Sequence, residues 1–520
     1  MSNRLIYNRR SLAIVCTILF LTFLDNTIVS VILSNIQSNL SAGVQDLQWV
    51  VDAYMLVFAV FMLTGGTLGD IFGRKKVLLS GVALFVAGSV VAMLSHSIGM
   101  LVTGRIIMGV GAAASEPGTL SMIRQMYPEH GQRSRALGIW AAVSGVALAF
   151  GPIIGGVIIG FTSWRGVFAF SAIFGTIALV AGIKILPESS DPTGRKLDIT
   201  GLLVGAITIS SVIVALITGE GSGYDSWWIA LLFAVSFVSA IAFILIELHK
   251  KDPVLPMKLF RKVQFSVANI VAFATNFGIF AVFFFVALYL QLIANFTGYQ
   301  IAVAFLAMTA AIVASAILAG RWNAAHKTIL LTIAGCLLSG IGVFIINLVI
   351  SPTVSSATLA WALTISGIGF GISLVTMTSS VLNIVPSERS GMAASTVNTF
   401  RELGGVFGVA ILGAIVNSRL TNQLGAQLKL LHLPANFQSF VIYAITHGGN
   451  TPQGVSVNPA ILAAHTQLVT QVTNAAYSAF SSGLTIALNI AGTMLVATGL
   501  ICLGIYFWRK HEFDEIAIAH

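Results

Sequence analysis

Five ionisable residues stand inside long apolar stretches of this chain: Asp25, Arg105, Glu116, Arg401 and Glu402. A charged side chain is costly in the hydrocarbon of a membrane, and such residues generally mark pathways for ions, protons or substrates. The three carboxylates can take up and release protons, and the two guanidinium groups can pair with them. These residue types therefore indicate proton exchange and the binding of charged ligands within a membrane.

Asp25 and Arg105 are expected to lie at similar depths. At 1.5 Å per residue, Asp25 lies about 12 Å from the predicted outer end of its helix, and Arg105 about 9 Å from the outer end of an antiparallel helix. We therefore expect a pair across adjacent helices. Burial disfavours a charged carboxylate, whereas a neighbouring cation favours it, so a balanced Asp can take a proton from outside and release it inside. The alternative is a permanent ion pair that only fixes helix packing.

The other three charged residues are expected near the middle of their helices. Glu116 directly precedes Pro117, and proline often bends a helix. Glu116 is a candidate for a second proton site or a cation contact; the alternative is an acid that faces a water-filled vestibule without a specific role. Arg401 and Glu402 point about 100° apart on a helix, so they need not pair. We expect one to face the cavity and the other a partner helix, with Glu402 as the acid contributed by the second half.

Two uncharged residues complete the expected substrate cavity. Phe277 belongs to an aromatic-rich stretch, and an aromatic wall suits lipophilic cations. The alternative is that these rings face lipid. Gln291 is a polar group near the outer end of the same stretch and a candidate gating contact. Asp52, at the outer end of the second apolar stretch, either extends the acidic path or is a solvated residue at a helix start.

Apolar stretches long enough to cross a bilayer position these residues. Hydrophobic residues make up 57% of the 520-residue chain and charged residues only 9%, whereas a soluble domain carries about 25% charged residues. A crossing helix needs about 20 apolar residues. Windows of that length predict an all-α membrane protein with fourteen spans at 11–33, 49–69, 77–97, 100–123, 136–161, 166–186, 199–218, 227–247, 265–292, 301–320, 328–350, 357–384, 391–416 and 483–507.

The distribution of basic residues predicts the orientation. With the N-terminus in the cytoplasm, 22 of the 27 Lys and Arg fall in inner segments, and only Arg165, Arg419 and Lys429 fall in outer loops. This asymmetry follows the positive-inside rule, so both termini are expected in the cytoplasm. It also argues against nucleic-acid binding as the reason for the net charge of +9. The three cysteines fall inside predicted helices, and no disulfide framework or metal site is expected.

The order of the spans predicts three parts and no soluble domain. We expect an N-terminal six-helix bundle at 1–186, two additional helices with linkers at 187–262, and a C-terminal six-helix bundle at 263–520. The last part includes a predicted outer loop at 417–482 with an amphipathic patch (Leu424, Leu428, Leu430 and Leu431). The patch is expected to lie on the membrane surface or to cap the outer mouth; the alternative is a mobile loop.

Several motifs resemble signatures of the major facilitator superfamily, and within it of the fourteen-helix drug/proton antiporters. The sequence GTLGDIFGRKK at 66–76 is similar to the signature between helices two and three. The resemblance implies an inner gate formed by Gly66, Asp70, Gly73 and Arg74. Ile71 stands where a basic residue is common, which implies a weaker latch.

Two further motifs carry the resemblance to proton-coupled exporters. LVTGRIIMGVGAAA at 101–114 resembles the helix-four signature whose Arg is implicated in proton coupling, here Arg105, with Met108 in place of a usual Gln. GVALAFGPIIGG at 145–156 resembles the helix-five signature of exporters. Its small residues also suit ordinary close helix packing. The residues of this motif are Gly145, Gly151, Pro152, Gly155 and Gly156.

The first and thirteenth helices add to the resemblance and also depart from it. LDNTIVSVIL at 24–33 is similar to the helix-one signature of the fourteen-helix branch, which implies that Asp25 accepts the proton. RELGGVFGVA at 401–410 is similar to the helix-thirteen signature, with Glu402 where Gln is common. Glu116 stands where the family often has an apolar residue.

The resemblance implies a proton-coupled exporter of lipophilic, cationic drugs or toxic compounds. Alternating access would operate between two six-helix bundles in the cytoplasmic (inner) membrane, with the proton gradient as energy source and no cofactor or metal. A monomer is expected, and an outer-membrane partner is left open. The chain has no phosphate-binding loop and no catalytic signature, so an ATP-driven pump and an enzyme are not expected. The alternatives are a dedicated exporter of one endogenous metabolite, antibiotic or lipid, and a sensor or scaffold that transports nothing.

Overall fold

The fold is entirely helical in the part of the chain that the computed structural model describes, which is residues 2–40, 42, 44–190, 198–250, 253, 255, 257–294, 296, 298–323, 328–352, 354–430 and 466–508. Thirteen helices are long and apolar enough to cross a membrane. The count is fourteen when the two segments of a bent helix, His130–Leu148 and Ile153–Phe161, form one span. Each of the fourteen predicted spans corresponds to one of these helices, which confirms the predicted fold class.

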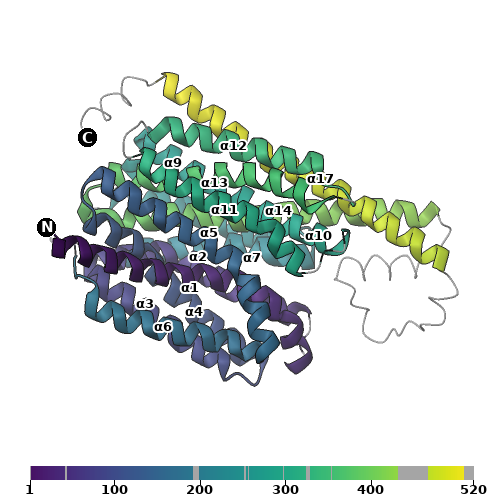
Figure 1. Ribbon diagram of the computed structural model, residues 1–520, viewed down its shortest axis with the longest axis horizontal. Helices are drawn as coiled ribbons and strands as arrows, with labels where there is room; N and C mark the ends of the chain where they lie inside the picture. The colour runs from purple at the N-terminus through teal and green to yellow at the C-terminus, as the bar shows by residue number, and fades with distance from the viewer. Residues whose placement is uncertain are drawn as a thin grey trace.

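The first six helices pack on one another along their lengths. Helix α1 packs on α5 and α6, whereas α4 packs on α2 and α3 (Figure 1). Small residues allow this close approach: an added Cβ at Gly104 in α4 would lie 2.8 Å from the backbone nitrogen of Ala92 in α3. The bounds are α1 Ser2–Leu40, α2 Val44–Phe72, α3 Arg74–Met93, α4 Ile98–Met126, α5 His130–Phe161 and α6 Trp164–Ile185.

The last helices form a second group. Within it, α13 packs on α11 and α12, while α14 packs on α9 and α17. A π-helical turn, η2, joins α9 to α10 within one span. The bounds are α9 Val263–Ala281, η2 Val282–Val286, α10 Ala287–Leu292, α11 Gly298–Asn323, α12 Thr328–Val349, α13 Ser356–Ile384, α14 Ser390–Leu430 and α17 Thr466–Trp508, with short 3₁₀ turns η1 Met257–Arg261 and η3 Ser387–Arg389.

Helices α7 (Ile199–Ser222) and α8 (Trp227–His249) lie between these groups in the sequence and beside them in space. Ile209 and Ile213 of α7 pack with Ala59 and Val60 of α2 in a small apolar cluster, which also contacts α14 through Leu403. Helix α8 packs on α7 and is otherwise largely exposed. The pair therefore covers the seam between α2 and α14 from one side.

The two groups of helices meet along two seams. One is the contact between α2 and α14, and the other is the contact between α5 and α11. At the second seam an added Cβ at Gly138 would lie 2.7 Å from the backbone oxygen of Ala316. At the first, an added Cβ at Gly66 would overlap the backbone oxygen of Gly391. Both seams are therefore close backbone crossings at glycine.

Helix α5 changes direction by 46° between its segments His130–Leu148 and Ile153–Phe161. Pro152 lies at this break, and a proline removes one backbone hydrogen bond of the helix. The proline therefore accounts for the bend in α5. Helix α4, by contrast, continues as a helix through Pro117.

The predicted outer loop at 417–482 is wrong at both ends. Helix α14 continues to Leu430 and α17 already begins at Thr466. The Gln423 side-chain amide donates a hydrogen bond to Ser482 Oγ at 3.1 Å, and Leu424 is buried. Polar Gln and Ser residues lower the hydropathy below that of a span, but they do not end a helix. Residues 431–465, which include Leu431, lie outside the described residues.

The amphipathic patch therefore has another role than the two that were expected. Leu424 and Leu428 are buried in the structure, and the amide of Gln427 donates to Ser478 Oγ at 3.3 Å. We call residues 417–430 and 466–482 the helical extension. It projects beyond the rest of the bundle, at the right of Figure 1.

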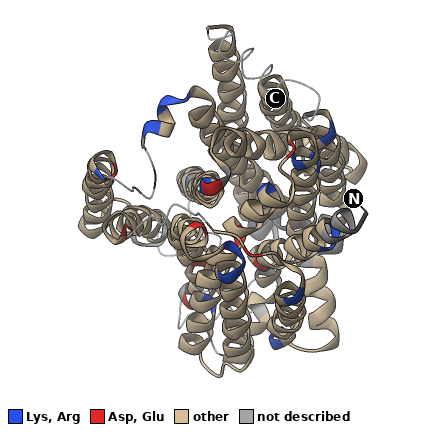
Figure 2. Cartoon of the chain, turned by 90° about the vertical axis from the view of Figure 1, so that its left-hand side faces the viewer, with Lys and Arg blue, Asp and Glu red and all other residues tan. Residues whose placement is uncertain are grey.

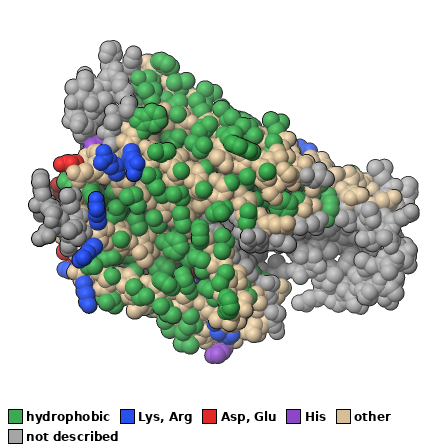
Figure 3. Space-filling model, viewed as in Figure 1, with side chains coloured by type: hydrophobic (Ala, Val, Ile, Leu, Met, Phe, Trp, Pro, Cys, Tyr) green, Lys and Arg blue, Asp and Glu red, His purple; other side chains and the backbone are tan. Residues whose placement is uncertain are grey.

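Charged and apolar side chains divide along the long axis of the molecule. Helix α1 begins and α17 ends at the same end, which we call the termini end (Figure 1). Lys and Arg gather at this end (Figures 2 and 3), and hydrophobic side chains cover the surface next to it. An apolar belt with a basic rim is the surface expected of a multi-pass membrane protein.

Candidate functional site

Asp25 and Arg105 form a buried ion pair. Arg105 Nη1 donates to Asp25 Oδ2, and both side chains are at most 1% exposed. Arg105 Nε donates to the backbone oxygen of Val50 at 2.8 Å, and its Cζ lies 4.4 Å from the ring centre of Tyr54. The structure thus brings the two residues together, as the matched depths predict.

The pair joins three helices of the first group. Asp25 belongs to α1 and Arg105 to α4, while Val50 and Tyr54 belong to α2. The Tyr54 hydroxyl donates to the backbone oxygen of Thr22 in α1 at 3.1 Å. Among the described residues, no hydrogen bond reaches Asp25 Oδ1, which is buried. One oxygen of this carboxylate is therefore available to a proton.

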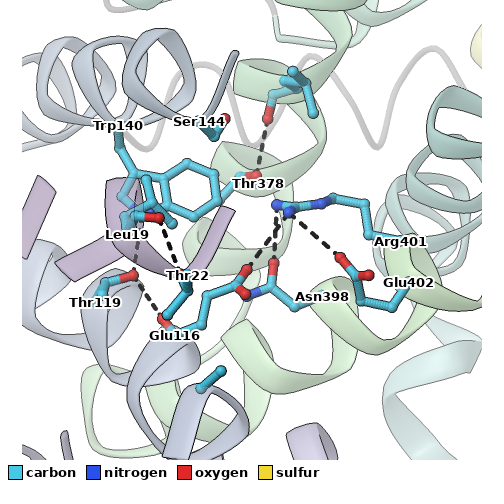
Figure 4. A network of polar contacts seen from close by, with 12 residues as sticks. Leu19, Thr22, Glu116, Thr119, Trp140, Ser144, Thr378, Asn398, Arg401 and Glu402 are labelled. Atoms are coloured by element: carbon cyan, nitrogen blue, oxygen red, sulfur yellow. Dashed lines mark hydrogen bonds and ion pairs between the residues drawn. The ribbon is translucent and has the colours of Figure 1, made fainter. Parts of the chain in front are cut away.

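A second charged cluster joins the two groups of helices. Arg401 of α14 has its Nη2 3.5 Å from Glu116 Oε1 of α4 and 3.8 Å from Glu402 Oε1 of its own helix (Figure 4). Its Nη1 donates to Asn398 Oδ1 at 3.2 Å. Glu116 and Arg401 are almost completely buried. Two carboxylates therefore share one guanidinium group.

Aromatic rings of the first group surround this guanidinium. Arg401 Cζ lies 5.0 Å from the ring centre of Phe23 and 5.4 Å from that of Trp140. Trp140 Nε1 donates to Thr119 Oγ1 at 3.0 Å, and Thr119 Oγ1 donates to the backbone oxygen of Glu116 at 2.6 Å. The ring of Trp140 is thus fixed to the same turn of α4 that carries Glu116.

This cluster corrects the expectation for Arg401 and Glu402. The sequence indicates no need for the two to pair, but the flexible Arg401 side chain reaches both Glu402 and, across the seam, Glu116. A 100° difference in direction separates the Cβ atoms of neighbours, not the ends of long side chains. The participation of Trp140 and Asn398 was not predicted, because an uncharged residue in an apolar helix gives no sequence signal of its contacts.

The predicted gate residues meet α14 at the termini end. Arg74 Nη2 lies 2.9 Å from Asp70 Oδ1 and also donates to the backbone oxygen of Glu388 at 3.0 Å. Asp70 accepts hydrogen bonds from the backbone nitrogens of Gly391 at 3.0 Å and Met392 at 2.9 Å. A carboxylate at a helix N-terminus satisfies free N–H groups and complements the helix dipole. These contacts join the end of α2 and the start of α3 to η3 and the start of α14 at the termini end.

Glycine is required at the turn that precedes Arg74. Gly73 has φ +110°, which side-chain-bearing residues rarely adopt, and an added Cβ would lie 3.0 Å from the Glu188 carboxylate. Gly66 lies at the close crossing of α2 and α14 described above.

Two arginines that the sequence marked only as basic extend the gate. Arg124 Nη2 donates to the backbone oxygen of Val385 at 2.8 Å, and Arg133 Nη2 donates to Asn383 Oδ1. Both contacts lie at the C-terminal end of α13, where cations complement the helix dipole. Their positive charge was the only sequence signal, and it does not specify a partner.

The exporter-like motif lies in the packing of α5. An added Cβ at Gly145 would lie 2.8 Å from Ile312 of α11, and one at Gly151 would overlap Thr27 of α1. Gly155 is buried, whereas Gly156 is exposed with no heavy atom within 4 Å of an added Cβ. Pro152 lies in the bend, and its side chain lies outside the described residues.

Among the uncharged cavity candidates, Phe277 has its described contacts away from the charged cluster. Phe277 is 4% exposed, with its ring centre 6.3 Å from that of Phe273, and packs on Gly408 of α14. Gln291 belongs to α10, but its side chain lies outside the described residues. Within the described part of the chain, no group of three or more His, Cys, Asp and Glu could hold a metal ion.

Comparison with known sequences identifies consistent relatives. A family model described as "Major Facilitator Superfamily" matches residues 15–409. The methylenomycin A resistance protein of Bacillus subtilis is 31% identical over 80% of this chain and 89% of its own length. The tetracenomycin C resistance and export protein of Streptomyces glaucescens is 27% identical over 95% of this chain and 90% of its own. The multidrug efflux pump LfrA of Mycolicibacterium smegmatis is 28% identical over 96% of both.

Solved structures share the fold at low sequence identity. The proton:xylose symporter XylE superposes with a TM-score of 0.60 and 13% identity, over 97% of this chain and 95% of that one. The human organic anion transporter MFSD10 gives a TM-score of 0.59 and 14% identity, over 78% of this chain and 93% of that one.

Proposed function

This chain belongs to the major facilitator superfamily, and on that premise we propose that it exports lipophilic, cationic drugs or toxic compounds in exchange for protons. It is a multi-pass membrane transporter rather than an enzyme. Export proceeds by alternating access, in which the two groups of helices rock about the seams at α2–α14 and α5–α11. The proton gradient supplies the energy, and no cofactor takes part.

The observation that carries the proposal is the pair of buried charge clusters. Asp25 and Arg105 form one, and Glu116, Arg401 and Glu402 form the other. The second cluster has two carboxylates for one guanidinium, so it favours a proton or a cationic ligand. Buried charges of this kind are retained where ions or substrates pass.

The contacts between the two halves at the proposed gate support alternating access. Hydrogen bonds from Arg74, Arg124 and Arg133 reach the loop between α13 and α14 or the end of α13. Asp70 holds the first turn of α14. All of these contacts join the two groups of helices at the termini end, so their release opens a path from that side.

The orientation and assembly are part of the proposal. The basic rim at the termini end supports a cytoplasmic position for both termini, by the positive-inside rule. The cytoplasmic membrane is then the site of action, and a monomer contains every residue of both clusters.

Relatives support export as the direction of transport. Three proteins similar to this chain over most of their length are named for resistance, export or efflux. Two of them are named for a single antibiotic, which favours a second candidate: a dedicated exporter of one compound. A panel of unrelated cations separates the two, because a drug exporter transports several of them and a dedicated exporter does not.

The test is ethidium transport in liposomes that contain the purified protein. We expect the wild type to transport ethidium only when a proton gradient is imposed. We expect Asp25→Asn to transport none, because the amide binds no proton at neutral pH. Asp225→Asn, in an exposed loop, is the control and retains transport. Gradient-driven transport that survives in Asp25→Asn moves the proton site to Glu116 or Glu402. Transport that ignores the gradient contradicts the antiport proposal.

A further inference from the structure

The guanidinium group of Arg401 is held by groups from the opposite half of the molecule. Glu116 of α4 lies 3.5 Å from Nη2, and the rings of Phe23 in α1 and Trp140 in α5 lie 5.0 and 5.4 Å from Cζ. All three belong to the first six helices, whereas Arg401 belongs to α14. Figure 4 shows its side chain extending from α14 toward Glu116 and Trp140.

These three groups have the chemistry of a receptor for a flat cation. A carboxylate supplies charge, and two aromatic faces attract a cation within about 6 Å of the ring centre. Thr119 fixes the ring of Trp140 beside Glu116, because its hydroxyl accepts from the indole N–H of Trp140 and donates to the backbone oxygen of Glu116. The three groups of the receptor therefore belong to α1, α4 and α5, and none of them lies on the helix that carries Arg401.

Arg401 fills this receptor imperfectly. Its contact with Glu116 measures 3.5 Å, whereas a charge-assisted hydrogen bond is typically about 2.7–2.9 Å. Glu116 Oε2 and Arg401 Nε are buried and have no hydrogen-bond partner among the described residues. A ligand that places a cation closer to Glu116 can use the oxygen that Arg401 leaves unpaired.

Arg401 also has partners on its own helix. Asn398 Oδ1 lies 3.2 Å from Nη1, and Glu402 Oε1 lies 3.8 Å from Nη2. If the side chain leaves Glu116, Asn398 still accepts its hydrogen bond and Glu402 still pairs with its charge. Withdrawal of Arg401 therefore leaves no buried charge on α14 without a partner.

We propose that the receptor of Glu116, Phe23 and Trp140 binds planar, delocalised monocations. When no such cation is bound, the guanidinium group of Arg401 occupies the receptor in its place. Such a cation displaces Arg401 from the receptor, and Arg401 returns when the cation leaves. Glu116, Arg401 and Trp140 are buried in this structure, so the exchange takes place only when the two halves separate. The inference rests on the proposed function only in that export delivers such a cation to this site.

The test measures binding without a gradient, in detergent, with ethidium as the planar probe. We expect Arg401→Met to bind ethidium about tenfold more tightly than the wild type, because an occupied receptor lowers apparent affinity by the fraction of molecules in which it is free. In the Arg401→Met background, Glu116→Gln should remove this gain. Fluorescence anisotropy of ethidium gives both affinities.

The shape of the cation and the folding of the variant are controlled separately. Tetraphenylphosphonium has the same charge but is tetrahedral, so its affinity should change much less between wild type and Arg401→Met. Arg401→Lys keeps a positive charge beside the two carboxylates but lacks the planar group, so it should fold and still bind ethidium more tightly. Thermal unfolding checks that each variant is folded.

Three outcomes would overturn the inference. The first is unchanged or weaker ethidium binding in both Arg401 variants, and the second is no ethidium binding by any variant. The third is an equal gain in affinity for tetraphenylphosphonium in Arg401→Met, which would refute selection for planarity. Because no gradient is present, these results do not depend on proton coupling. Tighter binding in Arg401→Met together with wild-type transport that ignores the gradient would support the receptor and contradict the proposed antiport.

Discussion

At the scale of single residues, the two buried clusters differ in charge balance. Asp25 and Arg105 are one acid and one base, tied to three helices of the same half. Glu116 and Glu402 share a single base, Arg401, across the seam between the halves. The charge of Asp25 is therefore neutralised within one half of the molecule. The neutralisation of Glu116 by Arg401 changes whenever the two halves move.

Removal of Arg105 should show how much the stability of the protein depends on the ion pair with Asp25. Arg105→Met leaves the Asp25 carboxylate buried without its partner, which typically costs about 3–5 kcal/mol. We expect a large drop in the unfolding temperature of the purified protein. The double variant Asp25→Asn/Arg105→Met should recover much of the loss, because no uncompensated charge is left. A double variant as unstable as the single one would contradict this account.

The sequence predicts the first cluster better than the second. The Asp25–Arg105 pair follows from a fixed rise per residue on two antiparallel helices, which sets both depths without knowledge of the rest of the fold. The Glu116–Arg401 contact joins residues 285 positions apart and exists only where α4 approaches α14. No local pattern encodes that approach, so the sequence predicts the candidate residues but not their partners.

At the scale of helices, the α2–α14 crossing at Gly66 is expected to limit how closely the two halves approach at the proposed gate. An added Cβ at Gly66 overlaps the backbone oxygen of Gly391, whereas one at Gly69 on the same helix has only Arg74 Cα within 4 Å, at 3.9 Å. The crossing therefore tolerates a side chain at one position and not at the other.

Gly66→Ala should hold the gate open at the termini end, because α2 and α14 cannot reach their present separation. We expect a longer distance between spin labels at Phe72 and Arg389, measured by pulsed electron resonance. Gly69→Ala is the matched control and should give the wild-type distance. An unchanged distance in Gly66→Ala would show that the crossing does not limit closure.

The helical extension should depend on its buried leucines. Leu424 is buried between α14 and α17, whereas Ala426, two residues later, is exposed. Leu424→Asp places a charge in this contact, so the extension should become sensitive to limited proteolysis. Ala426→Asp adds the same charge outside the contact and should keep wild-type resistance. Equal sensitivity in both variants would argue against packing as the source of stability.

Hydropathy predicts the membrane part of each helix but not its full length. It located the apolar parts of α14 and α17, and it missed the extension because Gln423, Gln427, Ser478 and Ser482 are polar. Those side chains bind one another across the two helices. Such pairing stabilises a helix outside the membrane and is invisible to a window that scores apolar character.

At the scale of the whole molecule, the two buried clusters together set the charge that moves in one cycle. In the proposed cycle Asp25 takes up one proton, and the cluster of Glu116, Arg401 and Glu402, with two acids and one base, binds one monocation. Exchange of one proton for one monocation therefore moves no net charge across the membrane. A membrane potential adds about 2.3 kcal/mol per charge per 100 mV, and it should not act on such a cycle.

Transport of ethidium should accordingly follow the pH gradient alone. In liposomes clamped by potassium and valinomycin, we expect the initial rate to change with the pH gradient and to stay constant when the potential is varied at fixed pH. A rate that rises with the potential would mean that more than one proton enters per cation, and the single-charge account would then be wrong.

Helix α14 links three regions of the protein in one element. It begins beside Asp70, carries Arg401 in its first third and ends in the helical extension, over 41 residues. A helix of this length measures about 60 Å, so a tilt of about 10° at one end displaces the other by about 10 Å. A tilt of α14 as one piece would therefore carry a movement at its start to the helical extension. A fluorophore on Ala426 would report each opening of the gate from the far side of the membrane, in whole cells and without touching the transport path.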